Sequence, residues 1–560
     1  MSVPAKPAVT LDIVPVDTLD RVFPDRKPEP PVFRGPVSVP RGGKVGFQFA
    51  VRSSAAGSCR MKVASIPGAG GAALEGAATL YRLDTVHVEG NTNGAMINRP
   101  GGTRPEEWTE FLTRDAPYDV AEVLVVSDTL PLEENVTRAA LVDIAVPART
   151  EPGRYGGTLH LEVDGESASA SFSFVVHRTQ VPAEPALSST NWLEHSPENL
   201  SSGKPPEWWS EAHWTLLANS GRQLRSFGDD MMLTPLIERE HPLIQAIREK
   251  DAKYRFDFSK FDRWIETFKA LGFRLFAGRH IHKMYQRPGV FVKTEETGKT
   301  EPLLENSKDH DAWLDFVPVF YRSLYAHLKK KGWLDLYVQH QYDEPTEEKG
   351  YRELAALREQ CMPGIRSIDA INQKPELYSS HVDIHVFSLM TLMKAQALAE
   401  ERRAKGQPVW LYHCTSPYPP WPNRHLDRPL SECRLYPLLC LKYRATGFLF
   451  WAANCYRRAD EYRTSLGPLP DGSQDPGHPP GDAWMFYRGP DGLRGSMRML
   501  VFRDGLLDHR LLQMLQMLQK KDAARAHAIL EGLARSVEDC ERNPASYHEA
   551  RKAMLSALDE

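Results

Sequence analysis

The feature that most constrains the fold of this chain is a change of pattern near residue 186. Beyond it, short apolar runs alternate with longer stretches of helical periodicity, which is typical of parallel strands joined by helices. Eight runs can be counted as strands, the fifth of them weak: 187–192, 231–237, 273–277, 334–341, 376–379, 382–387, 409–413 and 447–453. Eight such units predict a (β/α)8 barrel of TIM type, although a doubly wound open sheet would give a similar alternation.

The first 180 residues show a different pattern, in which short alternating strands are separated by Gly, Pro and Asp. Seven runs predict an all-β sandwich: 10–16, 45–52, 61–66, 79–88, 139–146, 157–163 and 167–176. We therefore predict three parts. These are a β-sandwich over 1–180, a catalytic (β/α)8 barrel over 186–465, and a C-terminal loop and helical region over 466–560 that packs on the barrel.

Composition excludes several classes of function. The net charge of −4, from 69 basic and 73 acidic residues, gives no support for a nucleic-acid partner. No apolar stretch is long enough to cross a membrane, so we expect no membrane insertion. The first residues lack the apolar centre of a signal peptide, which leaves open a cytoplasmic protein or an exported one whose signal has been removed. The oligomeric state is not indicated.

The seven cysteines are sparse and none forms a C-x-x-C pair, so neither a disulfide framework nor a structural zinc site is expected. No Gly-rich phosphate loop follows a strand and opens a helix. We predict no cofactor.

The strongest candidate for chemistry is the adjacent pair Asp343 and Glu344, which ends the fourth apolar run and is followed by Pro345. Two carboxylates at the end of a buried strand repel one another, and desolvation raises at least one pKa. In a (β/α)8 barrel the carboxyl ends of the strands carry the catalytic groups, and acid pairs with separated pKa values are typical of sugar chemistry. The alternative is that Asp343 caps the next helix and Glu344 is a solvated charge.

Other polar and aromatic side chains follow the remaining strands and would converge on the same rim, among them Trp192, His280, Trp410, Tyr412, Trp451 and Asn454. A competing hypothesis is a metal site built from His280 and His282, two residues apart, together with His340, His381 and His385. We favour an active site without a metal, because a metal needs a complete and well-placed ligand set.

Several segments in order along the chain resemble glycoside hydrolase family 123 and the wider set of proteins with domain of unknown function 4091. In the second half these are 342–345, 409–414, 422–423, 447–454, 481–484, 496–498 and 503–508, and in the first half 46–49 and 152–157. The resemblance implies a β-sandwich followed by a catalytic barrel. It also implies an exo-acting, retaining β-N-acetylgalactosaminidase that uses substrate-assisted catalysis on a glycan or glycoconjugate.

In that family an adjacent Asp-Glu pair carries the chemistry, and it matches Asp343 and Glu344 here. Glu344 would be the general acid/base, and Asp343 would orient the 2-acetamido group, whose oxygen attacks the anomeric carbon to give an oxazolinium ion. Such enzymes need no second carboxylate as nucleophile across the ring, so the two acids can be neighbours. Further substrate-binding side chains are expected: Trp192, His280, Trp410 and Trp451 around the pocket, Tyr412 on the acetamido oxygen, and Asn423 and Asn454 on hydroxyls.

Two alternatives remain open. One is a glycosidase of other sugar specificity that uses a distant carboxylate as nucleophile, with Glu194 and Asp383 as candidates. The other is a non-catalytic carbohydrate-binding protein on the same fold.

Overall fold

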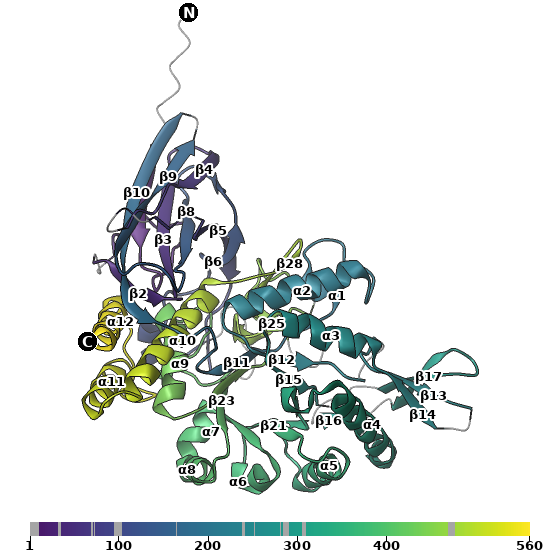
Figure 1. Cartoon of the computed structure of the whole chain (residues 1–560). Coiled ribbons are helices and arrows are strands. Elements are labelled where there is room, and N and C mark those ends of the chain that lie inside the picture. Colours follow the sequence, from purple (N-terminus) through teal and green to yellow (C-terminus); the bar gives the residue numbers. More distant parts are fainter. Residues whose placement is uncertain are drawn as a thin grey trace, which may run out of the picture.

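The computed structural model describes residues 10–560, apart from positions 28, 32–34, 69–70, 72, 75, 95–102, 164, 238–240, 251–252, 281, 284–289, 305–309, 458 and 469–475. A β-sandwich forms the upper lobe in Figure 1, a barrel of strands and helices forms the lower one, and the C-terminal helices lie beside the junction. Within the described ranges, none of the helices combines the length and apolar character that a membrane crossing requires.

The sandwich consists of two five-stranded sheets with a common apolar core. One has the order β1 (Leu11–Val16), β3 (Lys44–Ser53), β8 (Thr137–Ala145), β5 (Ala78–Val88) and β6 (Tyr118–Val126). The other has the order β2 (Val37–Arg41), β10 (Glu166–Gln180), β9 (Gly153–Val163), β4 (Gly57–Val63) and β7 (Thr129–Leu132). The predicted sandwich is confirmed.

The sequence did not reveal β2, β6 and β7. Prolines inside β2 and β7 weaken the strand pattern, because proline cannot donate to a ladder. Strand β6 is buried on both faces for most of its length and so shows no alternation.

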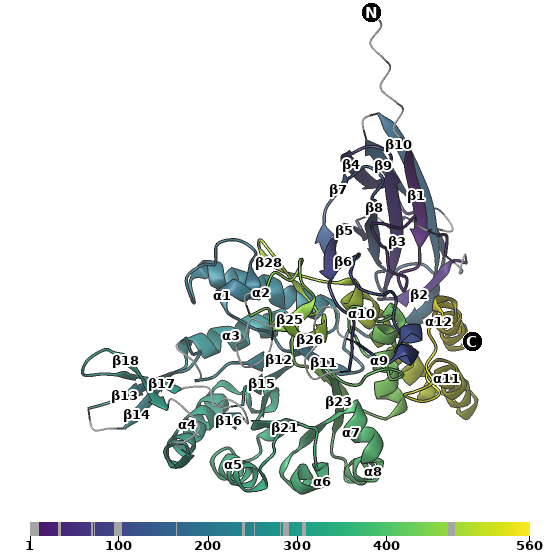
Figure 2. The same cartoon turned by 180° about the vertical axis from the view of Figure 1, so that it is seen from behind.

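The second part is a ring of eight parallel strands that is nearly closed, which confirms the predicted barrel. The order around it is β11 (Ser188–Asn191), β24 (Gly447–Phe450), β23 (Val409–His413), β22 (Ile384–Ser388), β21 (Arg366–Ile371), β19 (Tyr337–Gln339), β15 (Leu275–Gly278) and β12 (Met231–Thr234). Its helices are α1 (Pro197–Leu200), α2 (Glu211–Ser226), α3 (Ser259–Ala270), α4 (His310–Lys331), α5 (Glu348–Cys361), α6 (Pro375–Tyr378), α7 (Leu389–Lys394), α8 (Gln396–Ala404) and α9 (Leu430–Lys442). Figure 2 shows α3 to α8 along the outer side of the strands.

Two acidic residues just before β12 close the ring against β11, where no strand ladder forms. The Asp230 amide donates to the Ser189 carbonyl at 3.0 Å, and the Ser189 amide donates to Asp230 Oδ1 at 2.9 Å. Asp229 is fully buried and accepts from the amide and side chain of Asn191 at 3.1 and 2.8 Å. Hydrogen bonds to the two aspartate side chains, together with one backbone bond, therefore take the place of a ladder between β11 and β12.

One predicted strand was wrong. Residues 376–379 belong to α6 and the 3-10 helix η4 (Ser379–His381), because Pro375 stands at the first helical position and Lys374 adopts a positive φ of 43°. The fifth strand is β21, where Ser367 and Asp369 interrupt the apolar run and obscure it in the sequence. The fourth strand also starts later than expected, since the 3-10 helix η3 covers Leu334–Leu336.

Two insertions, one after β12 and one after β15, together form a small separate sheet. This sheet projects at the side of the barrel in both views (Figures 1 and 2). Its order is β14 (Tyr254–Asp257), β13 (Gln245–Arg248), β17 (Val290–Thr294) and β18 (Thr300–Leu304). A short pair, β16 (His282–Lys283) and β20 (Tyr342–Asp343), lies at the barrel rim.

The C-terminal part joins the barrel to the sandwich. It contains β25 (Leu466–Pro468), β26 (Pro476–Pro480), β27 (Tyr487–Gly489), β28 (Gly492–Arg494), α10 (Met497–Gln516), α11 (Lys520–Leu533) and α12 (Pro544–Asp559). From α10, Arg498 pairs with Glu122 of β6 at 2.6 Å and Arg503 pairs with Asp143 of β8 at 2.8 Å. Both ion pairs are buried, so this part packs on the sandwich as well as on the barrel.

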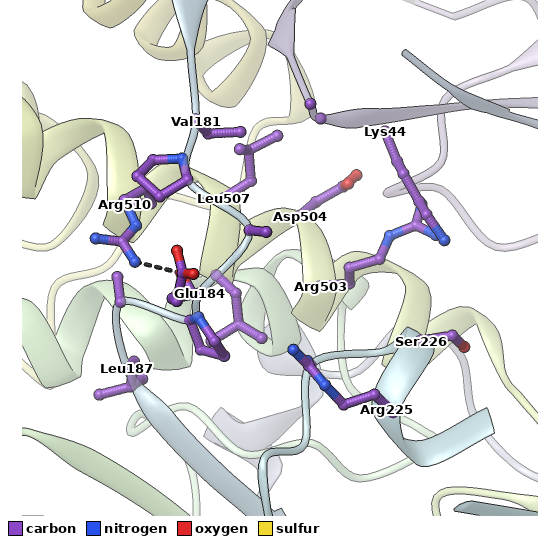
Figure 3. A pocket seen from close by; sticks show the side chains of 18 residues that line it. Lys44, Val181, Glu184, Leu187, Arg225, Ser226, Arg503, Asp504, Leu507 and Arg510 are labelled. Carbon is purple, nitrogen blue, oxygen red and sulfur yellow. Dashed lines mark hydrogen bonds between the residues drawn. The ribbon is translucent and has the colours of Figure 1, made fainter. Parts of the chain in front are cut away.

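A pocket of about 240 Å3 lies at this junction, between the segment that leaves β10 and helix α10 (Figure 3). Lys44, Arg225 and Arg503 border it, and Arg510 donates to the Glu184 carbonyl across it. Neither Asp343 nor Glu344 is among its lining residues, so the pocket is separate from the acid pair.

The buried ion pair of Glu122 with Arg498 is predicted to be essential for stability. Glu122→Gln should lower the free energy of unfolding by about 3–5 kcal/mol, because it leaves a buried guanidinium without its counter-charge. Urea denaturation checks this. Asp539→Asn, which breaks the exposed pair of Asp539 with Arg535, is the matched control and should cost at most about 1 kcal/mol. Equal losses of unfolding free energy for the two variants would contradict the essential role of the Glu122–Arg498 ion pair.

Candidate active site

The acid pair lies at the carboxyl end of the barrel strands. Strand β19 ends at Gln339, and the chain then runs through β20 to Asp343 and Glu344, both of which are half-buried. Pro345 follows and α5 begins three residues later, at Glu348. The pair therefore occupies the edge at which barrel enzymes place their catalytic groups.

Asp369 of β21 fixes the segment that leads to the acid pair. Its fully buried carboxylate accepts hydrogen bonds from His340 Nδ1 at 2.7 Å, from the amides of Gln341 and Tyr342 at 2.8 and 3.1 Å, and from the Tyr351 hydroxyl at 2.7 Å. Charge-assisted hydrogen bonds of this kind are stronger than neutral ones. The backbone just before Asp343 therefore has little freedom.

His340 stands between two carboxylates. Its Nδ1 bonds Asp369, and its Nε2 lies 3.8 Å from Asp343 Oδ1. Burial alone would lower the pKa of His340, but the carboxylates of Asp343 and Asp369 outweigh it and raise the pKa to about 9. At neutral pH the ring is therefore a cation that lies between the carboxylates of Asp343 and Asp369.

Glu344 is held in a conformation that non-glycine residues rarely adopt. Its φ is +48°, and its amide donates to the Ala370 carbonyl at 3.0 Å. The Tyr412 hydroxyl, on β23, donates to Glu344 Oε1 at 2.6 Å. Such a backbone costs about 1–3 kcal/mol and is typical of active sites, where the surrounding contacts compensate it. The strain aims the Glu344 carboxylate at Tyr412.

The aromatic side chains predicted for the pocket separate into two groups. Trp192 and Trp451, each just after its strand, are half-buried at the rim. The ring of Trp192 lies 5.3 Å from that of His340 and 6.2 Å from that of His280, which is itself buried. Trp192 and His280 therefore pack around His340, which in turn lies beside Asp343.

Trp410 is placed deeper than the other tryptophans. Its side chain is buried among the apolar residues that fill the barrel. A Cβ on Gly447, its partner on β24, would lie 2.0 Å from Trp410 Cε2, so the glycine makes room for the indole. Its position is explained by packing of the barrel interior.

The two asparagines predicted to bind hydroxyls use their side chains within the protein. Asn423 donates to the carbonyls of Cys414 and Pro417 at 3.0 and 2.9 Å. Asn454 donates to the carbonyls of Glu194 and Asn199 at 2.9 and 2.8 Å and accepts from the Glu194 amide at 2.8 Å. Both are buried, so a sugar contact would require these bonds to break.

Comparison with known proteins identifies the family to which the chain belongs. Residues 195–515 match the catalytic domain of glycoside hydrolase family 123. The chain belongs to glycoside hydrolase family 123. No curated protein matches the sequence.

One of the solved structures that resemble this chain shows the same fold. A family 123 glycoside hydrolase from Clostridium perfringens, reported in a study of glycolipid glycan hydrolysis, superposes with a TM-score of 0.75 over 98% of each chain at 15% identity. A GH10 xylanase with a bacterial Ig-like domain from termite gut gives a TM-score of 0.32 at 9% identity over 66% of this chain and 90% of that one. The second score is too low to carry an argument.

One of the two distant carboxylates considered as a nucleophile for this hydrolase is misplaced. Asp383 directly precedes β22, at the amino end of the strands and opposite the rim, where it accepts from the Ser367 amide at 2.7 Å. Glu194 follows β11 on the rim side and accepts from Arg279 Nη1 at 3.4 Å. Only Glu194 keeps a position from which it could face a substrate.

The competing metal hypothesis finds no support in the described part of the hydrolase, which contains no cluster of three or more His, Cys, Asp or Glu arranged to hold an ion. The His385 ring stacks on Phe387 at 3.7 Å between centroids. The side chain of His282 lies outside the described residues.

Two residues that hold the acid pair in place were not predicted from the sequence to have this role. Asp369 lies in the strand that the sequence did not reveal, and its signal is a single acid inside an apolar run. His340 was considered only as a metal ligand. Its contact with Asp369, 29 residues away, is visible only in the fold.

The raised pKa of His340 predicts a pH-dependent contribution to stability. Because its folded-state pKa of about 9 exceeds the unfolded value near 6.5, the contribution is fully present below about pH 6.5 and is lost as the pH rises through about 9. The stability difference between wild type and His340→Gln should therefore shrink between about pH 6.5 and pH 9. Urea denaturation across this range measures it.

His160→Gln, at an exposed position of β9, is the control for the substitution itself. A difference between wild type and His340→Gln that stays constant across the range would contradict the assigned pKa.

Proposed function

We propose that this family 123 hydrolase removes terminal β-linked N-acetylgalactosamine from glycans or glycoconjugates, with retention, by substrate-assisted catalysis. The observation that carries the proposal is the arrangement around the acid pair. Asp343 lies beside a cationic His340, while Glu344 accepts a hydrogen bond from Tyr412. The two neighbours in sequence thus have different surroundings, which suits two different roles.

Glu344 is the general acid/base in this proposal. In the first step it protonates the glycosidic oxygen while the acetamido oxygen attacks the anomeric carbon, and the bond to the leaving group breaks. The intermediate is an oxazolinium ion. In the second step the Glu344 carboxylate takes a proton from water, and the water oxygen attacks the same carbon from the side of the departed group. The bond from that carbon to the acetamido oxygen breaks, which restores the acetamido group. Two inversions give retention.

Asp343 orients the acetamido group. Its carboxylate accepts a hydrogen bond from the acetamido N–H and stabilises the positive charge that develops on the ring of the oxazolinium ion. The His340 cation supports this role, because its Nε2 lies 3.8 Å from Asp343 Oδ1 and its positive charge stabilises a carboxylate that accepts hydrogen bonds. Tyr412 has a single proton, donated here to Glu344, so it holds the acid in place.

The sugar and its aglycone are extrapolated from relatives. The Clostridium perfringens enzyme was studied for hydrolysis of glycolipid glycans, so a glycolipid is a reasonable first substrate for this hydrolase. Trp192 and Trp451 are exposed enough at the rim to stack on the apolar face of a sugar ring.

Hydrolysis of aryl β-glycosides of N-acetylgalactosamine, N-acetylglucosamine and galactose tests the proposal. Wild type should prefer N-acetylgalactosamine and leave galactose, which lacks the acetamido group, almost uncleaved. Glu344→Gln should lower kcat/KM by roughly 100- to 10,000-fold, which is the usual contribution of a general acid. Asp343→Asn should lower kcat more than it raises KM, because it acts on the transition state.

Glu348→Gln removes a partly exposed carboxylate of α5 and is the matched control, expected to retain activity. Equal rates on galactose would point to an enzymic nucleophile such as Glu194 in place of the acetamido oxygen. Full activity of Glu344→Gln would overturn the assignment of the site.

A further inference from the structure

The pocket between the segment that leaves β10 and helix α10, which we call the junction pocket, has an excess of positive charge (Figure 3). Its lining includes four basic side chains and two acidic ones: Lys44, Arg225, Arg503 and Arg510, and Asp504 and Glu184. The chain as a whole has a net charge of −4, so this local excess does not follow from composition. A concave surface lined mainly by one sign of charge attracts ligands of the opposite sign.

The basic residues of the junction pocket come from all three parts of the protein. Lys44 begins β3 of the sandwich, Arg225 lies in the last turn of α2 in the barrel, and Arg503 and Arg510 belong to α10. In Figure 3, Lys44 and Arg503 lie close together on one side, and Arg510 lies on the other side beside Glu184. A ligand that contacts several of these groups therefore bridges the three parts.

Two of the basic groups have no counter-charge. Within the described ranges, neither the Lys44 ammonium nor the Arg225 guanidinium makes a hydrogen bond or an ion pair, although both side chains are half-buried. Burial and the neighbouring charge of Arg503 lower the pKa of Lys44, as expected for two cations that repel one another. Partial removal of a cation from water without a partner is costly, so these groups favour a ligand that accepts hydrogen bonds.

Arg503 does not relieve this repulsion through its own partner. Its two terminal nitrogens donate to the Asp143 carboxylate, each at 2.8 Å. Asp143 is therefore engaged with Arg503, and it forms no ion pair with Lys44. The Arg503 Nε is buried and bonds no acceptor in the part of the chain that the structure describes. The positive charge around Lys44 thus remains incompletely balanced.

The acidic residues of the lining do not balance it either. Glu184 is exposed to solvent, and Arg510 donates to its carbonyl and not to its carboxylate. Asp504 is buried, but its carboxylate forms no ion pair with a basic residue among those described. Asp504 therefore opposes an anion in the pocket, and the four basic residues outnumber it.

The size of the junction pocket limits the ligand. Its volume of about 240 Å3 lies below the roughly 300–1,000 Å3 that is typical of sites for drug-sized molecules. Two lining glycines let the walls approach closely. Gly42 has a φ of +79° in the turn before Lys44, and at Gly228 a Cβ would lie 2.2 Å from Leu506 Cδ1. A compact anion therefore fits better than an oligosaccharide.

We propose that the junction pocket binds a small tetrahedral oxyanion, phosphate or sulfate, either free or as an ester on a single sugar. The oxygens of the anion accept from Lys44 and Arg225, and the charges of Arg503 and Arg510 add to the attraction. Because the donors belong to the sandwich, the barrel and α10, the anion stabilises the assembled arrangement of the three parts. The pocket is separate from Asp343 and Glu344, so this inference does not depend on the proposed sugar chemistry.

Calorimetric titration and thermal unfolding of the full chain test the inference. Sodium phosphate and sodium sulfate are each compared with sodium chloride at equal ionic strength. Wild type should bind at least one of the two oxyanions at a single saturable site. At a 100-fold excess over Kd, that anion should raise Tm by roughly 2–4 °C. Chloride should give no saturable binding.

Two variants assign the binding to the junction pocket. Lys44→Gln and Arg225→Gln should each raise Kd by roughly 10- to 100-fold, because each removes a hydrogen bond between charged groups. In chloride, Lys44→Gln should not lower Tm, since it removes a cation that Arg503 repels. Lys62→Gln in β4 and Arg222→Gln in α2 each remove an exposed positive charge outside the pocket, and these matched controls should keep the wild-type Kd.

Galactose 6-phosphate and galactose 6-sulfate distinguish the two sources of the anion. Tighter binding of an ester than of its free ion supports a sugar ester as the ligand, and the reverse supports the inorganic ion. A response that follows ionic strength alone, equal for chloride, would overturn the inference. Variants of Lys44 and Arg225 that bind as tightly as the controls would overturn it too. Since neither readout uses hydrolysis, an inactive wild type would contradict the proposed function alone.

Discussion

The packing of the sandwich, the barrel and the C-terminal part against one another depends on the buried guanidinium of Arg498. All five of its N–H donors have acceptors, supplied by Glu122, Arg424, Gly481, Trp484 and Tyr487. Glu122 belongs to the sandwich, and the other four belong to the loops and hairpin above the barrel. Because a buried charge is stable only when its partners are in place, the three parts must come together correctly for the rim to form.

The acid pair is held by a second constraint of the same kind. Asp369 gathers donors from the segment before Asp343, and the positive φ of Glu344 turns its side chain to Tyr412. Each acid therefore has a fixed neighbour of its own, a cation for Asp343 and a phenol for Glu344. This difference, and not the adjacency alone, is what suits one carboxylate to accept a hydrogen bond and the other to transfer a proton.

Most of the barrel and the acid pair could be predicted from the sequence, because apolar periodicity indicates strands and helices directly. Seven of the eight barrel strands were found, and β21 was missed because the polar Ser367 and Asp369 break its apolar run. The acid pair was found because its two residues are adjacent. The residues bound by Asp369 and the backbone carbonyls bound by Asn454 come from distant segments, so only the fold reveals them.

The central claim is that the substrate's acetamido oxygen is the nucleophile. Aryl β-N-acetylgalactosaminides whose acetyl group carries none, one, two or three fluorines test it most directly, because fluorine withdraws electrons from that oxygen with little change in shape. With wild-type enzyme, kcat/KM should fall steeply with each added fluorine. A rate that is independent of fluorination would contradict substrate assistance and indicate a nucleophile supplied by the protein.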